Sequence, residues 1–389
     1  MKLEIKFWLR FSLANLFIVA LLGLLMRYKI GFEFPYLDQK SLQLSHYNFA
    51  FTGWISQTLM VLMIYTLQNR LADFKVGKYT KVLFFNLICS YGMLVSFIVQ
   101  GYGLFSVTFS LLSIFISYYF ALLFLTDLKL VSKVNLFKNW FKAALFFNVA
   151  SSLGSFALVY MMVTKNILQT EYLASIYYFL HFQYNGWFLF ACMGLFFDFF
   201  GLKKSEDPFF ATSFKLFFVS GILAYGLSIL WMKLPVWLYI IVTAAAIIQV
   251  YAWFRLLFGF FRMKKDEIRK LDFSMRYVLL FVGFALSIKL LLQLGSTVPA
   301  ISKLAFGFRP IVIAYLHLVL LAVISLFLLF RIQVEAFFPR FGNTVFGLIL
   351  FSIGVVCNEI ILAIQGIASF SYTAIPYVNE LLFGVAAVL

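Results

Sequence analysis

Long apolar runs recur along the whole of this 389-residue chain, and they constrain its fold more than any other feature. A helix needs about 20 apolar residues to cross the hydrocarbon core of a bilayer. Backbone N–H and C=O groups find no water there, so a crossing segment must satisfy them internally, as a helix does. The sequence predicts twelve such helices, at residues 8–28, 44–67, 81–101, 103–126, 139–163, 172–200, 212–232, 235–261, 273–296, 308–330, 341–366 and 375–389.

The composition agrees with a chain that lies almost entirely in a membrane. Hydrophobic residues make up 64% and charged residues 12%, whereas about a quarter of the residues in a soluble domain are charged. We therefore expect an all-α polytopic membrane protein, with residues 1–389 forming a single transmembrane domain in contact with the lipid bilayer. The twelfth run is too short to cross, so we expect that the chain continues past Leu389 or that this helix is cut short.

The basic residues predict how the helices are oriented. Of the 31 Lys and Arg residues, only eight fall at one end of the predicted spans: Arg27, Lys29, Lys40, Lys165, Lys233, Lys289, Lys303 and Arg309. Cytoplasmic loops carry the excess of positive charge, so the N-terminus is predicted to be cytoplasmic. The net charge of +16 then faces acidic lipid headgroups, and no nucleic-acid partner is needed to explain it.

The three histidines predict a site inside the membrane. His46, His181 and His317 are 135 and 136 residues apart and lie in the outer thirds of spans two, six and ten. Ionisable side chains are costly in a bilayer and usually functional there. Five further polar residues are predicted at the same depth: Gln183, Asn185, Lys289, Glu359 and Glu380. Together they predict a shared site or a hydrated cavity.

The histidine spacing also suggests three pseudo-repeats of four helices, at about 1–130, 131–265 and 266–389. Residues 48–54 (NFAFTGW) align with 181–187 (HFQYNGW) and, more weakly, with 317–323 (HLVLLAV). This alignment pairs His181 and His317 with Asn48 and leaves His46 two residues earlier, about 200° away around the helix. We interpret the two Gly-Trp pairs as packing features, with glycine admitting a close helix and tryptophan anchoring at the interface.

Twelve spans in three units, with histidines near the outer ends of spans two, six and ten, resemble subunit I of the haem–copper oxidases. The segments 44–54, 178–187 and 306–317 resemble divergent oxidase-like membrane proteins of Bacteroidetes-type bacteria. The resemblance implies a bacterial inner-membrane location. It also implies one low-spin b-type haem with His46 and His317 as axial ligands, and with the cation of Arg309 available to a haem propionate.

The chain departs from the oxidase pattern at the oxygen-reducing centre. In the family, copper takes one histidine from span six and a consecutive pair from span seven. His181 matches the first, but residues 212–232 contain no histidine. Span ten also lacks the second histidine that holds the family's high-spin haem. Metal ligation is therefore expected only from His46, His181 and His317, copper is not expected, and neither is complete terminal oxidase activity.

Several alternatives remain open from the sequence. Each histidine is either a ligand or a hydrogen-bonded structural residue, and Glu359 either pairs with Lys289 or accepts protons. Arg309 and Pro310 are typical of a helix start. A transporter-like protein that binds a solute in the polar layer, or a non-catalytic assembly partner of respiratory-chain or other membrane subunits, would carry the same features. The phosphate-loop, dinucleotide and zinc-protease motifs of soluble enzymes are absent.

Overall fold

The computed structural model describes residues 4–202, 208–339 and 342–389, which form helices and no strand. This confirms the all-helical class. The described chain divides into two compact units. Unit 1 comprises Met1–Val131, Arg331–Ile361 and Ala374–Leu389, and unit 2 comprises Ser132–Phe330 and Leu362–Thr373. The single domain expected from the sequence stays a prediction.

The helices of unit 1 are α1 (Ile5–Gly31), α2 (Gln39–Phe49), the π-helical η1 (Ala50–Ser56), α3 (Gln57–Arg70), α4 (Gly77–Gln100), α5 (Leu104–Leu130) and α16 (Val378–Val388). Those of unit 2 are α6 (Phe137–Val163), α7 (Gln169–Leu180), η2 (His181–Phe188), α8 (Leu189–Phe199), α9 (Pro208–Leu223), η3 (Ala224–Ile229), α10 (Val236–Arg269), α11 (Phe273–Gly295), α12 (Pro299–Gly307), α13 (Arg309–His317) and η4 (Leu318–Ser325). Helices α14 (Leu326–Val334) and α15 (Gly342–Phe370) contribute residues to both units.

Ten helical segments in the described chain are long and apolar enough to cross a membrane. They match ten of the twelve expected spans, which confirms a polytopic membrane protein. The sixth expected span corresponds to the continuous helical path α7–η2–α8, whose centre carries the polar residues His181, Gln183 and Asn185. The twelfth corresponds to α16, which has 11 residues. The count of twelve spans stays a prediction.

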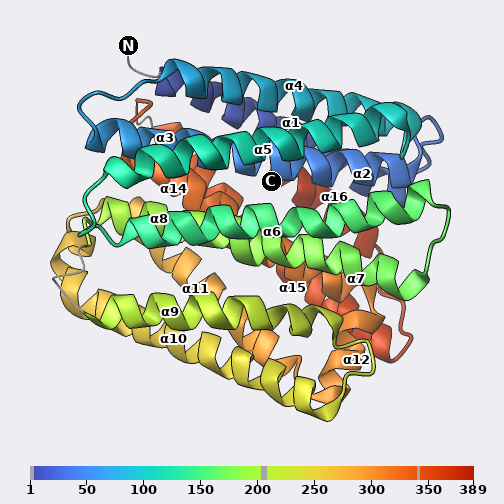
Figure 1. Cartoon of the computed structure of the whole chain (residues 1–389). Helices are drawn as coiled ribbons and strands as arrows, with labels where there is room; N and C mark the ends of the chain where they lie inside the picture. The colour runs from blue at the N-terminus through green and yellow to red at the C-terminus, as the bar shows by residue number, and fades with distance from the viewer. Residues whose placement is uncertain (1–3, 203–207, 340–341) are drawn as a thin grey trace. The chain divides into compact units, whose positions relative to one another are not determined.

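The path α2–η1–α3 forms the centre of unit 1. In Gln39–Arg70, 89% of the most apolar stretch is buried, against 22–50% in the other nine spans. Helices α1, α4 and α5 pack against this path, and α16 lies along α1 (Figure 1). The outer helices therefore expose apolar side chains such as Phe17, Phe84 and Phe115, as expected where lipid rather than water is the solvent.

Asparagines on neighbouring helices bond to the central path at its π-helical segment. The Asn15 side chain on α1 donates to the Gly53 carbonyl at 2.6 Å. On the other side, the Asn86 side chain on α4 donates to the Thr52 carbonyl at 3.1 Å. A π-helical turn disrupts regular backbone bonding, so these amides fix η1 between α1 and α4.

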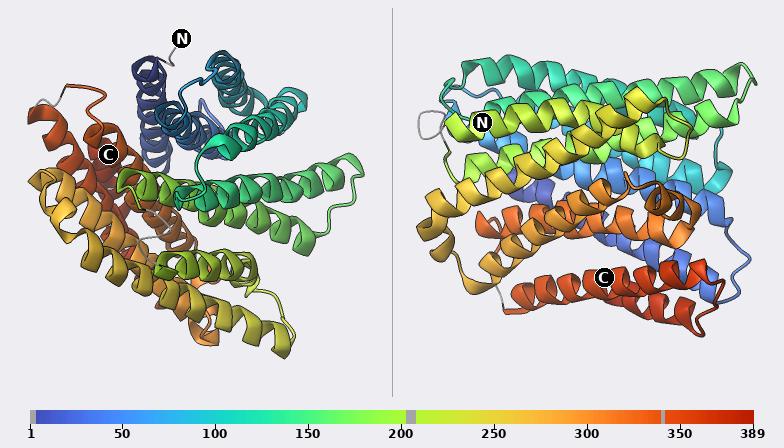
Figure 2. Two further views of the ribbon diagram at one scale, coloured as in Figure 1. Left: turned by 60° about the vertical axis from the view of Figure 1, so that its left-hand side comes forward. Right: turned by 90° about the horizontal axis from the view of Figure 1, so that it is seen from below.

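In unit 2, close helix contacts depend on small residues. Helices α9 and α10 lie side by side (Figure 2), and α6 packs on α7 and α8. A Cβ added to Gly154 on α6 would lie 2.6 Å from the Ser175 carbonyl oxygen on α7. At Gly186, a Cβ would lie 2.5 Å from Cβ of Phe147. The packing role predicted for the glycine of this Gly-Trp pair is therefore confirmed.

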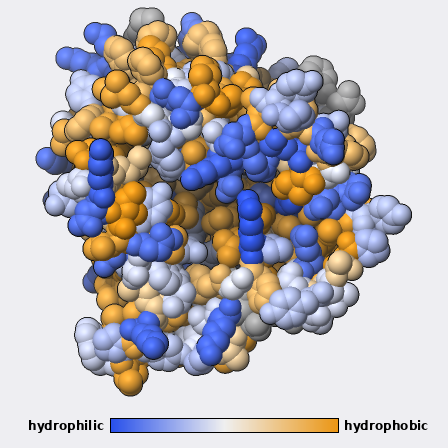
Figure 3. All heavy atoms as spheres, turned by 90° about the vertical axis from the view of Figure 1, so that its right-hand side faces the viewer, coloured by the Kyte–Doolittle hydropathy of each residue, from blue (hydrophilic) through white to orange (hydrophobic). Residues whose placement is uncertain are grey.

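The prediction that the two tryptophans anchor at the membrane interface is wrong. Trp54 and Trp187 are 1% and 0% exposed, so they fill the interiors of units 1 and 2 instead. The preceding glycines instead make room for phenylalanines, because a Cβ at Gly53 would meet the ring of Phe49 and one at Gly186 would meet Phe147. On the face that forms the right-hand side of Figure 1, hydrophilic side chains (blue) lie among apolar ones (orange) (Figure 3).

Candidate functional site: buried polar residues beside three pi-helical segments

Each histidine lies beside a π-helical segment. Segment η1 begins four residues after His46, η2 begins at His181, and η4 begins directly after His317. All three segments start within two residues of the positions that the sequence alignment pairs, Asn48, His181 and His317. π-helical turns inside α-helices occur frequently at functional sites. The π-helical segments and the histidines therefore indicate the same candidate functional positions.

His46 belongs to unit 1 and faces α1. Its ring bonds to the backbone of Val19. A Cβ added to Gly23 would lie 3.4 Å from Cε1 of His46, so the ring packs closely on that glycine. The Nδ1 atom is buried and has no hydrogen-bond partner among the described residues. An unsatisfied buried nitrogen of this kind costs free energy and is available to a ligand.

His181 belongs to unit 2 and is 1% exposed. Its Nε2 lies 2.9 Å from the carbonyl oxygen of Gly221, one of the last four residues of α9, whose carbonyls lack partners within the helix. Its Nδ1 lies 3.2 Å from Nδ2 of Asn185 and 3.5 Å from Oγ of Ser228. Because a carbonyl can only accept, Nε2 carries the proton and Nδ1 is the acceptor.

This arrangement bears on the metal-ligand prediction for His181. Both ring nitrogens are used within the protein, so binding a metal would require the loss of one of these bonds. The ligand role of His181 stays a prediction, and the structural alternative gains three specific contacts.

Lys289 on α11 is the most unusual charged residue of unit 2. It is 1% exposed, and its Nζ has no hydrogen-bond partner among the described residues. Its charge interacts with His181. The pairing of Lys289 with Glu359, one of the alternatives from the sequence, therefore finds no support. One turn further along α11, Oε1 of Gln293 also lacks a partner.

Two tyrosines extend this network to α13. Tyr184 bonds to Asn185 and Ser228, and its ring centroid is 6.3 Å from that of Tyr315 on α13. The Tyr315 hydroxyl and Oδ1 of Asn185 are both buried without a partner among the described residues. We call this set of six residues the lysine cluster: His181, Tyr184, Asn185, Ser228, Lys289 and Tyr315. The sequence analysis found three of its members, because neither tyrosine nor serine is unusual in a membrane span.

His317 and Arg309 lie at the two ends of α13. His317 is half-buried as the last residue of the helix, whereas Arg309 is exposed as its first residue. Pro310 lies in the first turn, so the predicted helix start is confirmed. Both side chains make further interactions within the structure.

The other members of the predicted polar layer are not part of the lysine cluster. Gln183 faces α6, where its amide donates to Oγ of Ser151 at 2.7 Å and to Oδ1 of Asn148 at 3.2 Å. Glu359 belongs to unit 1 and accepts from Asn358 at 3.1 Å. Glu380 is exposed in the first turn of α16, where a carboxylate stabilises the helix dipole. These residues were predicted to share a site because they share a depth in the membrane, but depth alone does not tell which way a side chain points.

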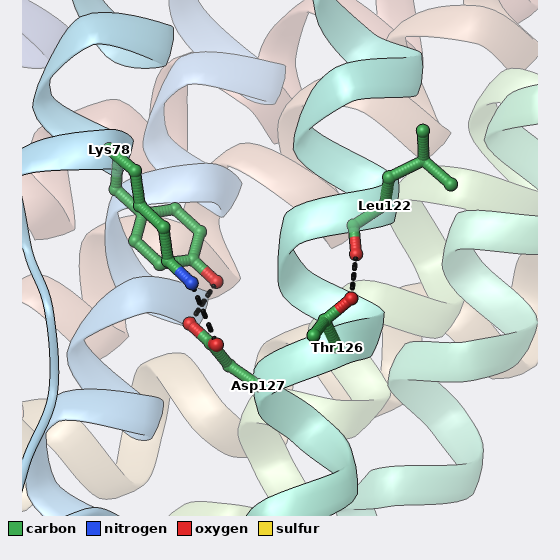
Figure 4. A network of polar contacts seen from close by, with 5 residues as sticks. Lys78, Leu122, Thr126 and Asp127 are labelled. Atoms are coloured by element: carbon green, nitrogen blue, oxygen red, sulfur yellow. Dashed lines mark hydrogen bonds and ion pairs between the residues drawn. The ribbon is translucent and has the colours of Figure 1, made fainter.

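Sequence reasoning missed a polar group in unit 1. Asp127 on α5 accepts from Nζ of Lys78 at 2.7 Å and from the hydroxyl of Tyr79 at 2.8 Å, both on α4 (Figure 4). Beside it, Thr126 bonds back to the Leu122 carbonyl of its own helix. A single aspartate near a basic helix end carries no special signal in the sequence, so only the packing of α4 on α5 reveals this ion pair.

No protein-family model matches the chain. No curated protein matches its sequence. Within the described residues there is also no group of three or more His, Cys, Asp or Glu side chains arranged to hold a metal ion.

Proposed function

We propose that the chain is a divergent membrane protein of the haem–copper oxidase subunit I type, with twelve spans in three four-helix pseudo-repeats. The three π-helical segments at aligned positions support the repeats. The basic residues support a cytoplasmic N-terminus, and the resemblance supports the bacterial inner membrane. Its proposed activity is electron transfer or sensing through one low-spin b-type haem, with His46 and His317 as axial ligands and without an oxygen-reducing copper centre.

The observation that carries this proposal is the buried, unpartnered Nδ1 of His46. An imidazole in a membrane interior normally has both nitrogens satisfied, as at His181, so an open nitrogen fits a missing ligand. Arg309 lies about 12 Å along the axis of α13 from His317 and would supply a cation for a propionate. When bound, a haem of this kind transfers single electrons, and its axial ligands and surroundings set its potential.

A reduced-minus-oxidised absorption spectrum of the purified protein tests this proposal. We expect a sharp α-band that is lost in His46→Ala and in His317→Ala. Gly23→Leu should also remove it, because its side chain would occupy the space of the His46 ring, whereas Gly384→Leu should not, because a Cβ at Gly384 meets nothing within 4 Å. A protein without haem, or a spectrum unchanged in both histidine variants, would reject the proposal.

The lysine cluster favours a second candidate function, the binding of a small carboxylate as in a transporter. The ammonium of Lys289 and the hydroxyl of Tyr315 are buried donors without a partner among the described residues, and a carboxylate oxygen could accept from either. No acidic side chain of the described chain pairs with Lys289. Charged residues inside membrane spans often mark substrate pathways.

Uptake of radiolabelled acetate into proteoliposomes tests this second candidate. We expect uptake by the unaltered protein and by Lys303→Met, an exposed control at a helix outside the cluster. We expect none by Lys289→Met. Equal uptake by the two variants, or no uptake at all, would reject the transporter function. Co-purification with respiratory subunits in that case would point to an assembly role.

A further inference from the structure

A long apolar groove runs along unit 2, and none of the six residues of the lysine cluster lines it. It encloses about 480 Å³ between α8, α10, α11 and the η4–α14 helix, and its walls include Cys192, Phe196, Leu257, Leu286 and Val323. This volume lies within the range of ligand sites, about 300–1,000 Å³. The indole N–H of Trp253 is satisfied by the Ser287 hydroxyl at 2.8 Å, so the groove offers almost nothing but carbon and sulfur to an occupant.

The groove is deep on one side and open on the other. Leu256 and Leu286 in its floor are 1% and 3% exposed, whereas Phe254 and Phe284 at its edges are 42% and 63% exposed. On α11 the lining extends from Leu279 to Leu291, a rise of about 18 Å. One leaflet of a bilayer has a hydrocarbon depth of about 15 Å, so the groove matches a single extended acyl chain.

Basic residues lie where this groove ends, at the turn between α10 and α11. Residues 262–276 contain six basic and three acidic side chains. Two of the acids are already used, because Glu267 pairs with Lys264 at 2.9 Å and Asp266 with Arg269 at 3.6 Å.

Two of these cations continue the groove-lining faces by helical spacing. Lys265 directly follows the kink of α10 at Lys264 and precedes the lining residue Ile268 by three positions, so these two residues share a helix face. It is exposed and makes no ion pair within the described chain. Arg276 precedes the lining residue Leu280 by four positions on α11. Its Nη2 donates to the backbone carbonyls of Arg269 and Leu271, both at 3.2 Å, and its Nε is buried without a partner among the described residues.

We propose that this groove is a binding site for one anionic phospholipid, with an acyl chain between α8, α10 and α11 and the phosphate at Lys265 and Arg276. The apolar walls select a hydrocarbon chain, and the uncompensated cations select a negative headgroup over a zwitterionic one. Under the predicted orientation the lipid belongs to the cytoplasmic leaflet, the one that carries most of the basic loops.

Native mass spectrometry of the full chain in detergent tests the proposal, with dioleoyl phosphatidylglycerol and dioleoyl phosphatidylcholine as probes. The unaltered protein should retain one phosphatidylglycerol in preference to phosphatidylcholine. Lys265→Gln with Arg276→Gln should lower this preference about 25-fold, since each basic group near the headgroups contributes roughly fivefold. The control is Lys233→Gln with Lys303→Gln, two exposed lysines elsewhere in unit 2, which should leave the preference unchanged.

A second variant tests the apolar part without touching a charge. Gly283 lines the groove, and a Cβ there meets nothing within 4 Å. Gly283→Phe should therefore fill the groove and abolish lipid retention, whereas Gly384→Phe, at an equally open glycine outside it, should not. Equal retention of both lipids by the unaltered protein overturns the proposal. Full retention of phosphatidylglycerol by Gly283→Phe also overturns it. If the double variant does not fold, Lys265→Gln alone is tested instead, and full retention by that variant overturns the proposal.

Discussion

Replacing Lys289 by methionine should make the protein more stable, which is unusual for a substitution at a fully buried position. The Lys289 ammonium is buried without a hydrogen-bond partner among the described residues. A buried donor without a partner costs about 1–3 kcal/mol, and a charged one costs more. Methionine has a similar length, no donor, and enough flexibility to fill the same space. We therefore expect the free energy of unfolding to rise by about 1–3 kcal/mol.

Unfolding in mixed micelles with increasing fractions of SDS, followed by tryptophan fluorescence, measures this change. The transition midpoint should move to higher SDS while the slope of the transition stays the same, as for a pure change in stability. Lys303→Met is the matched control. Its lysine is exposed, so the free energy of unfolding should change by less than about 0.5 kcal/mol.

A loss of stability in Lys289→Met would refute the reasoning. It would mean that the ammonium is satisfied in the folded protein, and that the lysine cluster is a structural network rather than an open site. A gain in stability accompanied by loss of acetate uptake would instead show that the unaltered protein is less stable because it keeps an unsatisfied group at a functional position.

Three further predictions concern packing and charge outside the lysine cluster. Gly154→Ala should destabilise the protein by about 1–3 kcal/mol in the same SDS assay, because the new Cβ meets backbone atoms of α7, while Gly283→Ala should change little. Asp127→Asn should cost about 1–3 kcal/mol, because it removes the charge that both donors in Figure 4 share; an unchanged midpoint would contradict this. The Ser41 backbone N–H donates to the carboxylate of Asp38 at 2.7 Å and lowers the pKa of that carboxyl below 3.8. The contribution of this bond to stability should therefore be present above pH 3.8 and disappear as the pH falls through the lower folded value. The protection factor for hydrogen exchange at the start of α2, the ratio of the intrinsic to the observed exchange rate, should lose this pH dependence in Asp38→Ala.

The imidazoles of His46 and His181 show how far sequence reasoning reached. The spacing of His46 and His181 placed both on apolar helices, and in the structure both histidines adjoin buried segments, η1 and η2. Which of the two has an open nitrogen could not be predicted. That difference depends on Asn185 and Ser228, which lie 3.2 and 3.5 Å from Nδ1 of His181, while no described residue supplies a partner for Nδ1 of His46.

The sequence by itself determined the helical class, the membrane setting and the approximate limits of most spans. Each membrane helix satisfies its own backbone, so its existence depends only on a local run of apolar residues. The tertiary structure decided which polar side chains are partnered. Gln183 and Asn185 are two residues apart, yet one bonds to α6 and the other to His181. Such contacts depend on how each helix is rotated against its neighbours, and that rotation is set by packing between distant segments rather than by the hydropathy of any one of them.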